Sequence, residues 1–201
     1  RVDVIEMLKR AYRVQEVVDY SGLEPDGLFL EGTGAMVLDH SDRVAYAVRS
    51  NRTDPVVLER FCAQFGYEPM VFDAEDRSGR SVYHTNVLMC IATEFVMICL
   101  DMITDPGRRD EIVRRFEACG RDVIALTHQQ ITDFAGNAIE LQAPGDRVLA
   151  LSARAAASLT EDQRGVIGCS ARLLALDVPT IEMAGGSVRC MLAGVHLARR
   201  G

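Results

Sequence analysis

Three side chains of this chain could together carry out cysteine-dependent hydrolysis: the thiol of Cys190, the imidazole of His84 and the carboxylate of Glu31. A cysteine becomes a useful nucleophile when a neighbouring base or cation lowers its pKa, and a carboxylate can hold the imidazole that acts as this base. Cys190 follows the pair Gly185-Gly186, and glycine lets a backbone come close to a ligand. The combination predicts attack by a thiolate on an electrophilic carbon.

Each candidate also has a plainer interpretation when it is taken alone. Residues 185–190, followed by the apolar stretch 191–197, are typical of a turn that leads into a buried strand. Glu31 could be an ordinary loop acid, and His84 could be a hydrogen-bonded histidine of the core. Asn137, a fourth polar candidate, follows a glycine and is typical of a turn. A shared position in the fold is what would favour the functional interpretation.

The spacing of these residues indicates such a shared position. Glu31 and His84 are 53 residues apart, His84 and Asn137 are again 53 apart, and Gly186 comes 49 residues after Asn137. A period near 50 residues, built of strand, strand, helix and strand, is typical of a repeat architecture closed around an axis. Equivalent positions of successive repeats would then converge at one end of this axis. This arrangement would bring a carboxylate, an imidazole, an amide and a thiol into one pocket.

Three consecutive units must position these groups, each with a polar or glycine-rich start, two apolar strands, an amphipathic helix and a further strand. Before them, the apolar spacing predicts a helix over 2–12 and a short strand over 14–20, and after them 190–197 should form a last strand. The predicted elements of the units are strands 35–39 and 43–48, helix 55–65 and strand 68–72; strands 87–92 and 94–102, helix 107–118 and strand 122–127; and strands 138–142 and 147–151, helix 161–175 and strand 180–183.

The composition excludes several classes of function. With 201 residues, of which 48% are hydrophobic and 25% charged, the chain is long enough to bury one core. A net charge of −7 without a basic block argues against a nucleic-acid partner. The longest apolar run, 95–100, is too short to span a membrane. We therefore expect a small-molecule ligand, and a homo-oligomer stays open.

The cysteines and histidines do not have the spacing of a metal site. No CxxC motif is present, and the four histidines show no ligand spacing with the cysteines, so no zinc is predicted. A chain of this size needs no disulfide framework, which favours core thiols in a reducing cytoplasm. Asp39 and Asp133 could support the site or could simply cap loops. The cysteines predicted to be core are Cys62, Cys90, Cys99, Cys119 and Cys169.

Four segments resemble the guanidino-group-modifying superfamily, which includes arginine deiminases, dimethylarginine dimethylaminohydrolases and amidinotransferases. The resemblance is greatest to the branch of arginine deiminase-related citrulline utilization hydrolases, and it covers essentially the whole chain. The segments that carry it, in the order of the family, are Leu30-Glu31-Gly32-Thr33-Gly34, Tyr83-His84-Thr85-Asn86-Val87-Leu88-Met89, Phe134-Ala135-Gly136-Asn137 and Ala184-Gly185-Gly186-Ser187-Val188-Arg189-Cys190-Met191.

The resemblance implies an α/β fold of the pentein type, an α/β-propeller of five ββαβ modules with the active site on its axis. This chain would hold about three and a half of the five modules. Residues 1–201 would accordingly be a single catalytic domain that lacks its N-terminal modules, together with an additional substrate-binding aspartate found there in the family. The strand over 190–197 would belong to a module whose remainder lies upstream.

The resemblance also implies a role for each candidate. Cys190 corresponds to the nucleophile, His84 to the general acid and base, and Glu31 to the carboxylate that binds a substrate nitrogen and orients the site. In Ser50-Asn51-Arg52-Thr53, the guanidinium of Arg52 would grip the α-carboxylate of the substrate, which suits its planar fork. No metal or organic cofactor is implied. The remaining predicted substrate-binding residues are Asn86, Asn137 and Gly186.

One departure from the family pattern bears on the substrate. Arginine deiminases carry His-x-Asp where this chain has His84-Thr85-Asn86. A neutral amide can pair with a neutral ureido group, whereas an aspartate suits a cationic guanidinium. The sequence therefore favours citrulline, which would yield ornithine, carbon dioxide and ammonia through a covalent intermediate on Cys190. The alternatives are an arginine deiminase or dimethylarginine dimethylaminohydrolase-like enzyme, and a non-catalytic pentein binding module such as the ribosome anti-association factor of the same fold.

Overall fold

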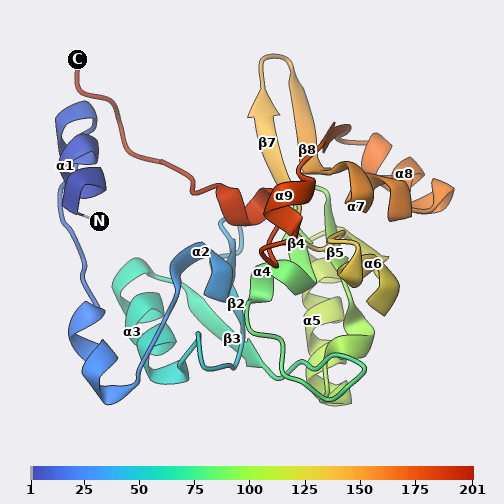
Figure 1. Ribbon diagram of the computed structural model, residues 1–201, viewed down its shortest axis with the longest axis horizontal. Helices are drawn as coiled ribbons and strands as arrows, with labels where there is room; N and C mark the ends of the chain where they lie inside the picture. Colours follow the sequence, from blue (N-terminus) through green and yellow to red (C-terminus); the bar gives the residue numbers. More distant parts are fainter. Residues whose placement is uncertain (1) are drawn as a thin grey trace.

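Three small sheets follow one another along the chain, and each is assembled in the same way (Figure 1). The computed structural model describes residues 2–201. In every sheet the first strand runs antiparallel to the second, and the third lies parallel to the second, which confirms three ββαβ units. The strands are β1 (Met36–Asp39), β2 (Val44–Val48) and β3 (Glu68–Phe72); β4 (Met89–Ile91), β5 (Phe95–Ile98) and β6 (Asp122–Ala125); and β7 (Ile139–Ala143), β8 (Asp146–Ser152) and β9 (Arg172–Leu176).

Aspartate side chains cap the starts of the first two crossover helices. Asp54 accepts a backbone hydrogen bond at the start of α3 (Pro55–Phe65), and Gly66 ends this helix in the left-handed conformation. Asp105 starts α5 (Pro106–Ala118) in the same way. Both helices match their predicted positions. The other helices are α1 (Val2–Ala11), α2 (Gly32–Ala35), α4 (Thr85–Leu88), α6 (His128–Thr132), α7 (Ala153–Ser158), α8 (Glu161–Gly168) and α9 (Pro179–Glu182), with 3₁₀ turns η1 (Ser21–Asp26), η2 (Leu100–Met102) and η3 (Val188–Met191).

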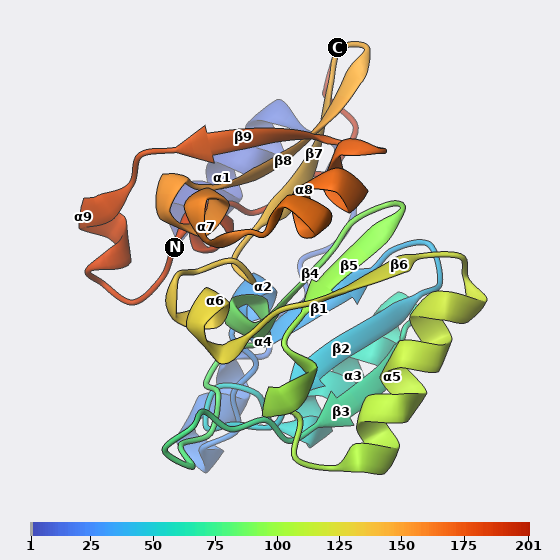
Figure 2. The same ribbon diagram turned by 90° about the vertical axis from the view of Figure 1, so that its right-hand side faces the viewer.

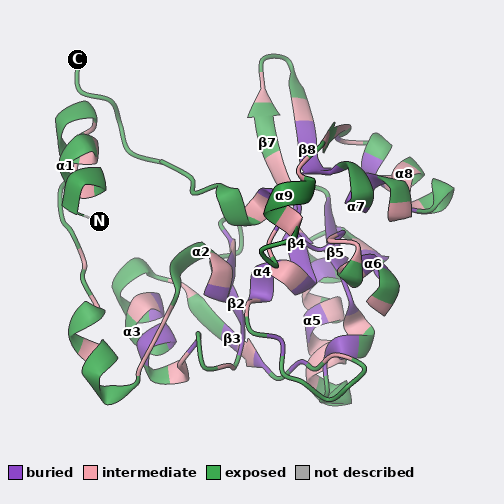
Figure 3. Ribbon diagram, in the orientation of Figure 1, coloured by how far each residue is buried: buried purple, intermediate pink, exposed green. Residues whose placement is uncertain are grey.

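One apolar core joins the three units. Every residue of the central strands β2 and β5 is buried, and so are the last five residues of β8 (Figure 3). The main core cluster contains Tyr46, Phe95 and Leu149, one from each sheet. Tyr46 also stacks on Phe116 of α5, with ring centroids 5.0 Å apart, so the helix of the second unit packs on the sheet of the first (Figure 2). The units are therefore held in fixed relative positions.

A buried ion pair reinforces the junction between the first two units. Both terminal nitrogens of Arg121 donate to the carboxylate of Asp39, at 2.7 and 3.0 Å, and both side chains are almost fully enclosed. Asp39 also accepts the backbone N–H groups of Ser41 and Asp42, which makes it the cap of its turn. Asp39 therefore has a structural role. Asp133 pairs with Arg154 in the third unit, at 2.8 Å.

The third unit corrects two predicted elements. The helix expected over 161–175 ends at Gly168, and the strand that pairs with β8 is β9 (Arg172–Leu176). The strand expected over 180–183 is instead the short helix α9, because Pro179 occupies its first turn, where a fixed φ and a missing N–H favour a helix start. In the second unit, β5 ends at Ile98, and η2 occupies the last three residues of the strand expected over 94–102.

The two outer strands predicted from the sequence do not form. Residues 14–20 and 190–197 contain no strand, since residues 190 and 191 belong to η3, and the two ends of the chain meet mainly at an isolated bridge between Tyr12 and Arg199. A β-strand needs a hydrogen-bonded partner along its length, and neither segment finds one among the described residues. Helix α1 forms as predicted, yet it buries none of its residues and lies beside the C-terminal segment, away from the core (Figures 1 and 3).

Burial separates the cysteines into two groups. Cys62, Cys90 and Cys99 are buried, as the sequence predicts for core thiols, and burial raises the pKa of Cys90 to about 12. Cys119 and Cys169 are exposed instead, because each stands at the C-terminal end of a helix, where the chain turns back toward the surface. Over residues 2–201, no helix is both long and apolar enough to cross a bilayer.

Candidate functional site

The fold places the four candidate groups at corresponding points of successive units. Glu31 immediately precedes α2, His84 precedes α4, and Asn137 precedes β7. Cys190 lies in η3, after the third unit. The residues follow one another at equal intervals of 53 residues, so the period found between Glu31, His84 and Asn137 extends to Cys190 itself. The interval is the signal that points most directly to these four positions.

Glu31 is shared between two basic partners. Its Oε2 lies 2.9 Å from Nε2 of His84, and its Oε1 accepts a 2.6 Å hydrogen bond from Nη1 of Arg52. The His84 ring rests directly on Gly34, where an added Cβ would lie 2.8 Å from ring atoms. Only glycine therefore leaves room for this imidazole. The carboxylate therefore orients the ring through Nε2.

The surroundings of Glu31 favour its ionised form. Partial burial raises the pKa of this carboxyl, but the hydrogen bonds and charges of Arg52 and His84 outweigh that effect. The net result is a pKa below the ordinary value of 4.5. Glu31 is therefore a carboxylate near neutral pH, which is the form that can hold an imidazole in a fixed orientation.

Two amides surround the thiol of Cys190. Nδ2 of Asn137 lies 3.1 Å from the sulfur and Nδ2 of Asn86 lies 3.4 Å from it, both as donors. Oδ1 of Asn86 is 3.7 Å from the same sulfur and can accept the thiol proton. Both amides therefore direct a hydrogen-bond donor at the sulfur. Both asparagines are buried, although Cys190 itself is exposed.

Asn137 also fixes the loop that carries the nucleophile. Its Oδ1 accepts the backbone N–H groups of Ser187 and Cys190, at 3.0 and 3.4 Å. Its Nδ2 donates to the carbonyl of Asn86 at 2.8 Å, in addition to its contact with the sulfur. The amide therefore ties α4, the start of β7 and η3 together. These bonds give Asn137 a positioning role, which the sequence did not reveal.

The glycine pair before Cys190 is held from the other side. The hydroxyl of Tyr83 donates to the carbonyl of Gly185 at 2.8 Å. Gly185 has φ of 90°, a conformation that side chains disfavour, and a Cβ on Gly186 would lie 3.1 Å from the sulfur of Cys190. Ser50 in turn donates to the carbonyl of Tyr83. Tyr83 stands in a motif noted from the sequence, but nothing there indicated its contact with Gly185.

The predicted residues thus form two neighbouring groups. The first group contains Glu31, His84 and Arg52. The second contains Cys190, Asn86 and Asn137, and Gly186 lies directly against the sulfur of Cys190. The structure gives no hydrogen bond between His84 and Cys190. The nucleophile and the acid–base group are therefore linked through the start of α4, where His84 immediately precedes the helix and Asn86 lies in its first turn. Over residues 2–201, no group of three or more histidine, cysteine or acidic side chains could hold a metal ion.

The family of the chain follows from comparison with known proteins. The family described as N,N dimethylarginine dimethylhydrolase, eukaryotic, matches residues 1–197. The chain belongs to this family. Membership in the dimethylarginine dimethylhydrolase family confirms the resemblance to the guanidino-group-modifying superfamily. It does not single out the citrulline utilization branch. No curated protein sequence matches the chain.

Solved structures similar to this member of the dimethylarginine dimethylhydrolase family show the same fold. A cysteine-to-alanine variant of AgrE in complex with L-arginine is 17% identical, with a TM-score of 0.65 over 82% of this chain and 23% of its own. ArgZ, an arginine dihydrolase from the ornithine–ammonia cycle in Cyanobacteria, is 15% identical, with a TM-score of 0.65 over 94% of this chain and 30% of its own. An adduct of a histidine-to-glycine variant of dimethylarginine dimethylaminohydrolase with S-methyl-L-thiocitrulline is 14% identical. Its TM-score is 0.55 over 83% of this chain and 55% of its own.

These structures establish that the chain has part of a pentein fold. It spans less than a third of the length of the AgrE and ArgZ chains. The similarity is confined to the fold, because the identities are low.

Proposed function

We propose that this chain forms the catalytic part of a cysteine hydrolase that cleaves a C–N bond of a guanidino or ureido amino acid. The observation that supports it best is the environment of Cys190, whose sulfur lies within 3.4 Å of two buried amide nitrogens. A second buried asparagine beside the sulfur is unnecessary for packing, since an apolar residue would fill the same space without needing partners. Family membership agrees with this reaction class.

The reaction would begin with addition of the Cys190 thiolate to the sp² carbon of the substrate. The tetrahedral intermediate collapses when His84 gives a proton to the departing amine, and the carbon stays bound to sulfur. His84 then takes a proton from water, whose oxygen attacks that carbon and releases the thiolate. For citrulline, one water is consumed, and the products are ornithine, carbon dioxide and ammonia.

The charges around the site support a neutral ureido substrate such as citrulline. The negative charge of Glu31 is already balanced by Arg52 and by the contact with His84. The groups beside the sulfur, Asn86 and Asn137, are neutral. Only Nη1 of Arg52 is used by Glu31, so its other donors are free to bind the α-carboxylate of the amino acid.

The second candidate substrate is dimethylarginine, which is the compound named in the family description. Its hydrolysis would consume one water and give citrulline and dimethylamine. A cationic guanidinium would need carboxylates beyond Glu31, and we propose that modules preceding this chain in a longer protein supply them. The three sheets would then be three of five modules, with residues 1–201 as part of one pentein domain.

A product assay tests the proposal. The chain is incubated separately with citrulline and with dimethylarginine, and ornithine, ammonia and dimethylamine are measured for wild type, Cys190→Ala and Cys169→Ala. Cys169 is the matched control, because it is an exposed thiol outside the site. We expect wild type to release ornithine and ammonia from citrulline. Cys190→Ala should abolish this release, and Cys169→Ala should leave it unchanged.

Other results have equally clear meanings. Activity that survives in Cys190→Ala would refute a covalent cysteine mechanism. Release of dimethylamine from dimethylarginine, with no product from citrulline, would make dimethylarginine the substrate in place of citrulline. If neither substrate reacts, even when the preceding modules are added, the chain is a binding module.

A further inference from the structure

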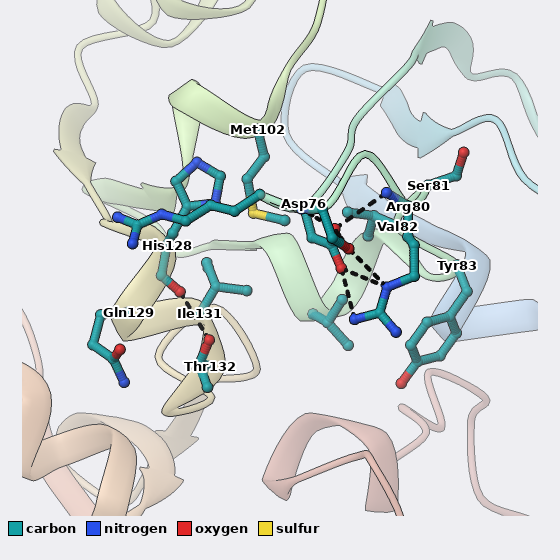
Figure 4. Close-up of a pocket in the computed structure, with 13 residues that line it drawn as sticks. Asp76, Arg80, Ser81, Val82, Tyr83, Met102, His128, Gln129, Ile131 and Thr132 are labelled. Atoms are coloured by element: carbon teal, nitrogen blue, oxygen red, sulfur yellow. Dashed lines mark hydrogen bonds and ion pairs between the residues drawn. The ribbon is translucent and has the colours of Figure 1, made fainter.

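A second pocket lies beside the candidate site and does not contain its reactive groups. It has a volume of about 610 Å³ and opens between the loop of residues 76–83 and helix α6 (Figure 4). Cys190, His84 and Glu31 do not line it. This pocket is therefore a separate space, large enough for a molecule of amino-acid size.

The lining of the pocket carries a positive charge without a partner among the described residues. Asp76 and Arg80 neutralise each other at 3.0 Å, as the dashed lines of Figure 4 indicate. Arg77, which stands between them, forms no hydrogen bond or ion pair with any residue of the described range 2–201. His128 also lines the pocket, and its ring has no hydrogen-bond partner in that range. The charged side chains that line the pocket therefore sum to a positive charge.

The loop that presents Arg77 is well ordered by its own bonds. The carboxylate of Asp76 accepts the backbone N–H groups of Ser78 and Arg80 and the hydroxyl of Ser78. These bonds hold the pKa of Asp76 well below its ordinary value. The carboxylate of Asp76 therefore binds groups of its own loop and does not neutralise the charge of Arg77.

Apolar side chains from both sides line the rest of the pocket. Val82 and Met102 are buried, and Val87 and Ile131 are half-buried along the same pocket. In Figure 4 the side chains of Met102 and Ile131 lie between His128 and the pair of Asp76 and Arg80, and Val82 lies beside Arg80. A ligand that fits would carry a single negative charge at one end and a short apolar segment at the other.

We propose that this pocket binds a small monocarboxylate with a short apolar tail. The carboxylate pairs with the guanidinium of Arg77, whose planar fork can give two parallel hydrogen bonds, and His128 supplies a further donor. The tail lies against Met102 and Ile131, where it releases water from apolar surface. This binding is independent of hydrolysis at Cys190, so it does not rest on the proposed function.

Binding of hexanoate, followed by NMR on methyl-labelled protein, tests this proposal. We expect saturable shifts of the Met102 and Ile131 methyl signals in wild type and in Cys190→Ala. The variant Arg77→Gln should raise the dissociation constant at least about tenfold, because a charge-assisted hydrogen bond is lost. Arg114→Gln is the matched control, since Arg114 is an exposed arginine of α5 outside the pocket, and it should bind as wild type does.

Three outcomes would overturn the proposal. The first is the absence of any hexanoate-dependent shift at Met102 or Ile131. The second is equal affinity of Arg77→Gln and wild type, with the remaining signals of the variant unchanged so that misfolding is excluded. The third is equally tight binding of butylammonium, which would show that the pocket selects only an apolar tail.

Discussion

The carboxylate of Glu31 is the side chain on which the acid–base half of the site depends. One oxygen holds His84 and the other holds Arg52, so loss of the charge would release both partners at once. Asn137 has the matching role on the nucleophile side, because it binds two backbone N–H groups and the sulfur of Cys190. Each half of the site therefore contains one small polar residue that positions the others.

The lowered pKa of Glu31 predicts a pH dependence of stability. A carboxyl whose pKa is lower in the folded chain contributes stability above its unfolded pKa, near 4.5, and loses it as the pH falls through the folded value. Wild type should therefore exceed Glu31→Gln in free energy of unfolding above pH 5, and the difference should shrink progressively below pH 4.5. Urea unfolding at a series of pH values measures it.

Glu117→Gln provides the control for this titration, because Glu117 is exposed and its side chain forms no hydrogen bond or ion pair within residues 2–201. Its difference from wild type should stay nearly flat with pH. A gap between wild type and Glu31→Gln that grows on acidification would contradict the assigned hydrogen bonds of Glu31.

At the scale of elements, the tight approach of two units at Gly136 makes a second prediction. A Cβ on Gly136 would lie 2.5 Å from the carbonyl oxygen of Val87 and 3.0 Å from that of Leu88, so the backbone of α4 would have to move. We expect Gly136→Ala to lower the free energy of unfolding by about 1–3 kcal/mol, as overpacking does. Thermal or urea unfolding measures the change.

Gly165 supplies the opposite case in the same protein. It lies inside α8, and an added Cβ would meet no atom within 4 Å. Gly165→Ala should stabilise the chain by about 0.5–1 kcal/mol, because alanine favours a helix interior over glycine. If Gly136→Ala and Gly165→Ala changed the free energy of unfolding in the same direction, the close contact at Gly136 would not explain the effect of Gly136→Ala.

The elements also show how far the sequence alone could lead. Helix α3 and strand β3 match their predicted bounds, because Asp54, Pro55 and Gly66 are strong local signals for the start and end of a helix. The stretch at 180–183 was assigned wrongly, since a short apolar run fits a strand or a helix equally well and Pro179 decides between them.

The candidate site was harder to predict in its contacts than in its members. The 53-residue spacing brought out Glu31, His84 and Asn137, and the glycine pair and the family motifs brought out Cys190. The bonds from Asn137 to the loop of Cys190 depend on tertiary geometry, which no local pattern encodes. The pocket at Arg77 was missed for the same reason, because its two walls come from separate units.

At the scale of the molecule, the pair of Arg121 and Asp39 links the first two units. Removing one member of a buried ion pair leaves the other charge without a partner, which costs about 3–5 kcal/mol. Arg121→Ala should therefore strongly destabilise the chain, whereas Arg172→Ala, which breaks an exposed pair with Asp146, should change stability by about 1 kcal/mol at most. Urea unfolding of both variants measures the difference. An equal loss of unfolding free energy in the two variants would show that burial of the Arg121–Asp39 pair does not increase its contribution to stability.

The arm made by α1 and the C-terminal segment has a consequence for how the molecule opens. Since α1 buries none of its residues, local unfolding of this arm costs far less free energy than unfolding of the buried strand β5. Amide protons of α1 will therefore exchange with solvent through frequent local openings. Those of β5 will exchange only when the whole chain unfolds. Cys190 comes just before the C-terminal segment and is bound by Asn137 of the core. The nucleophile thus lies at the border between a rapidly exchanging region and a protected one.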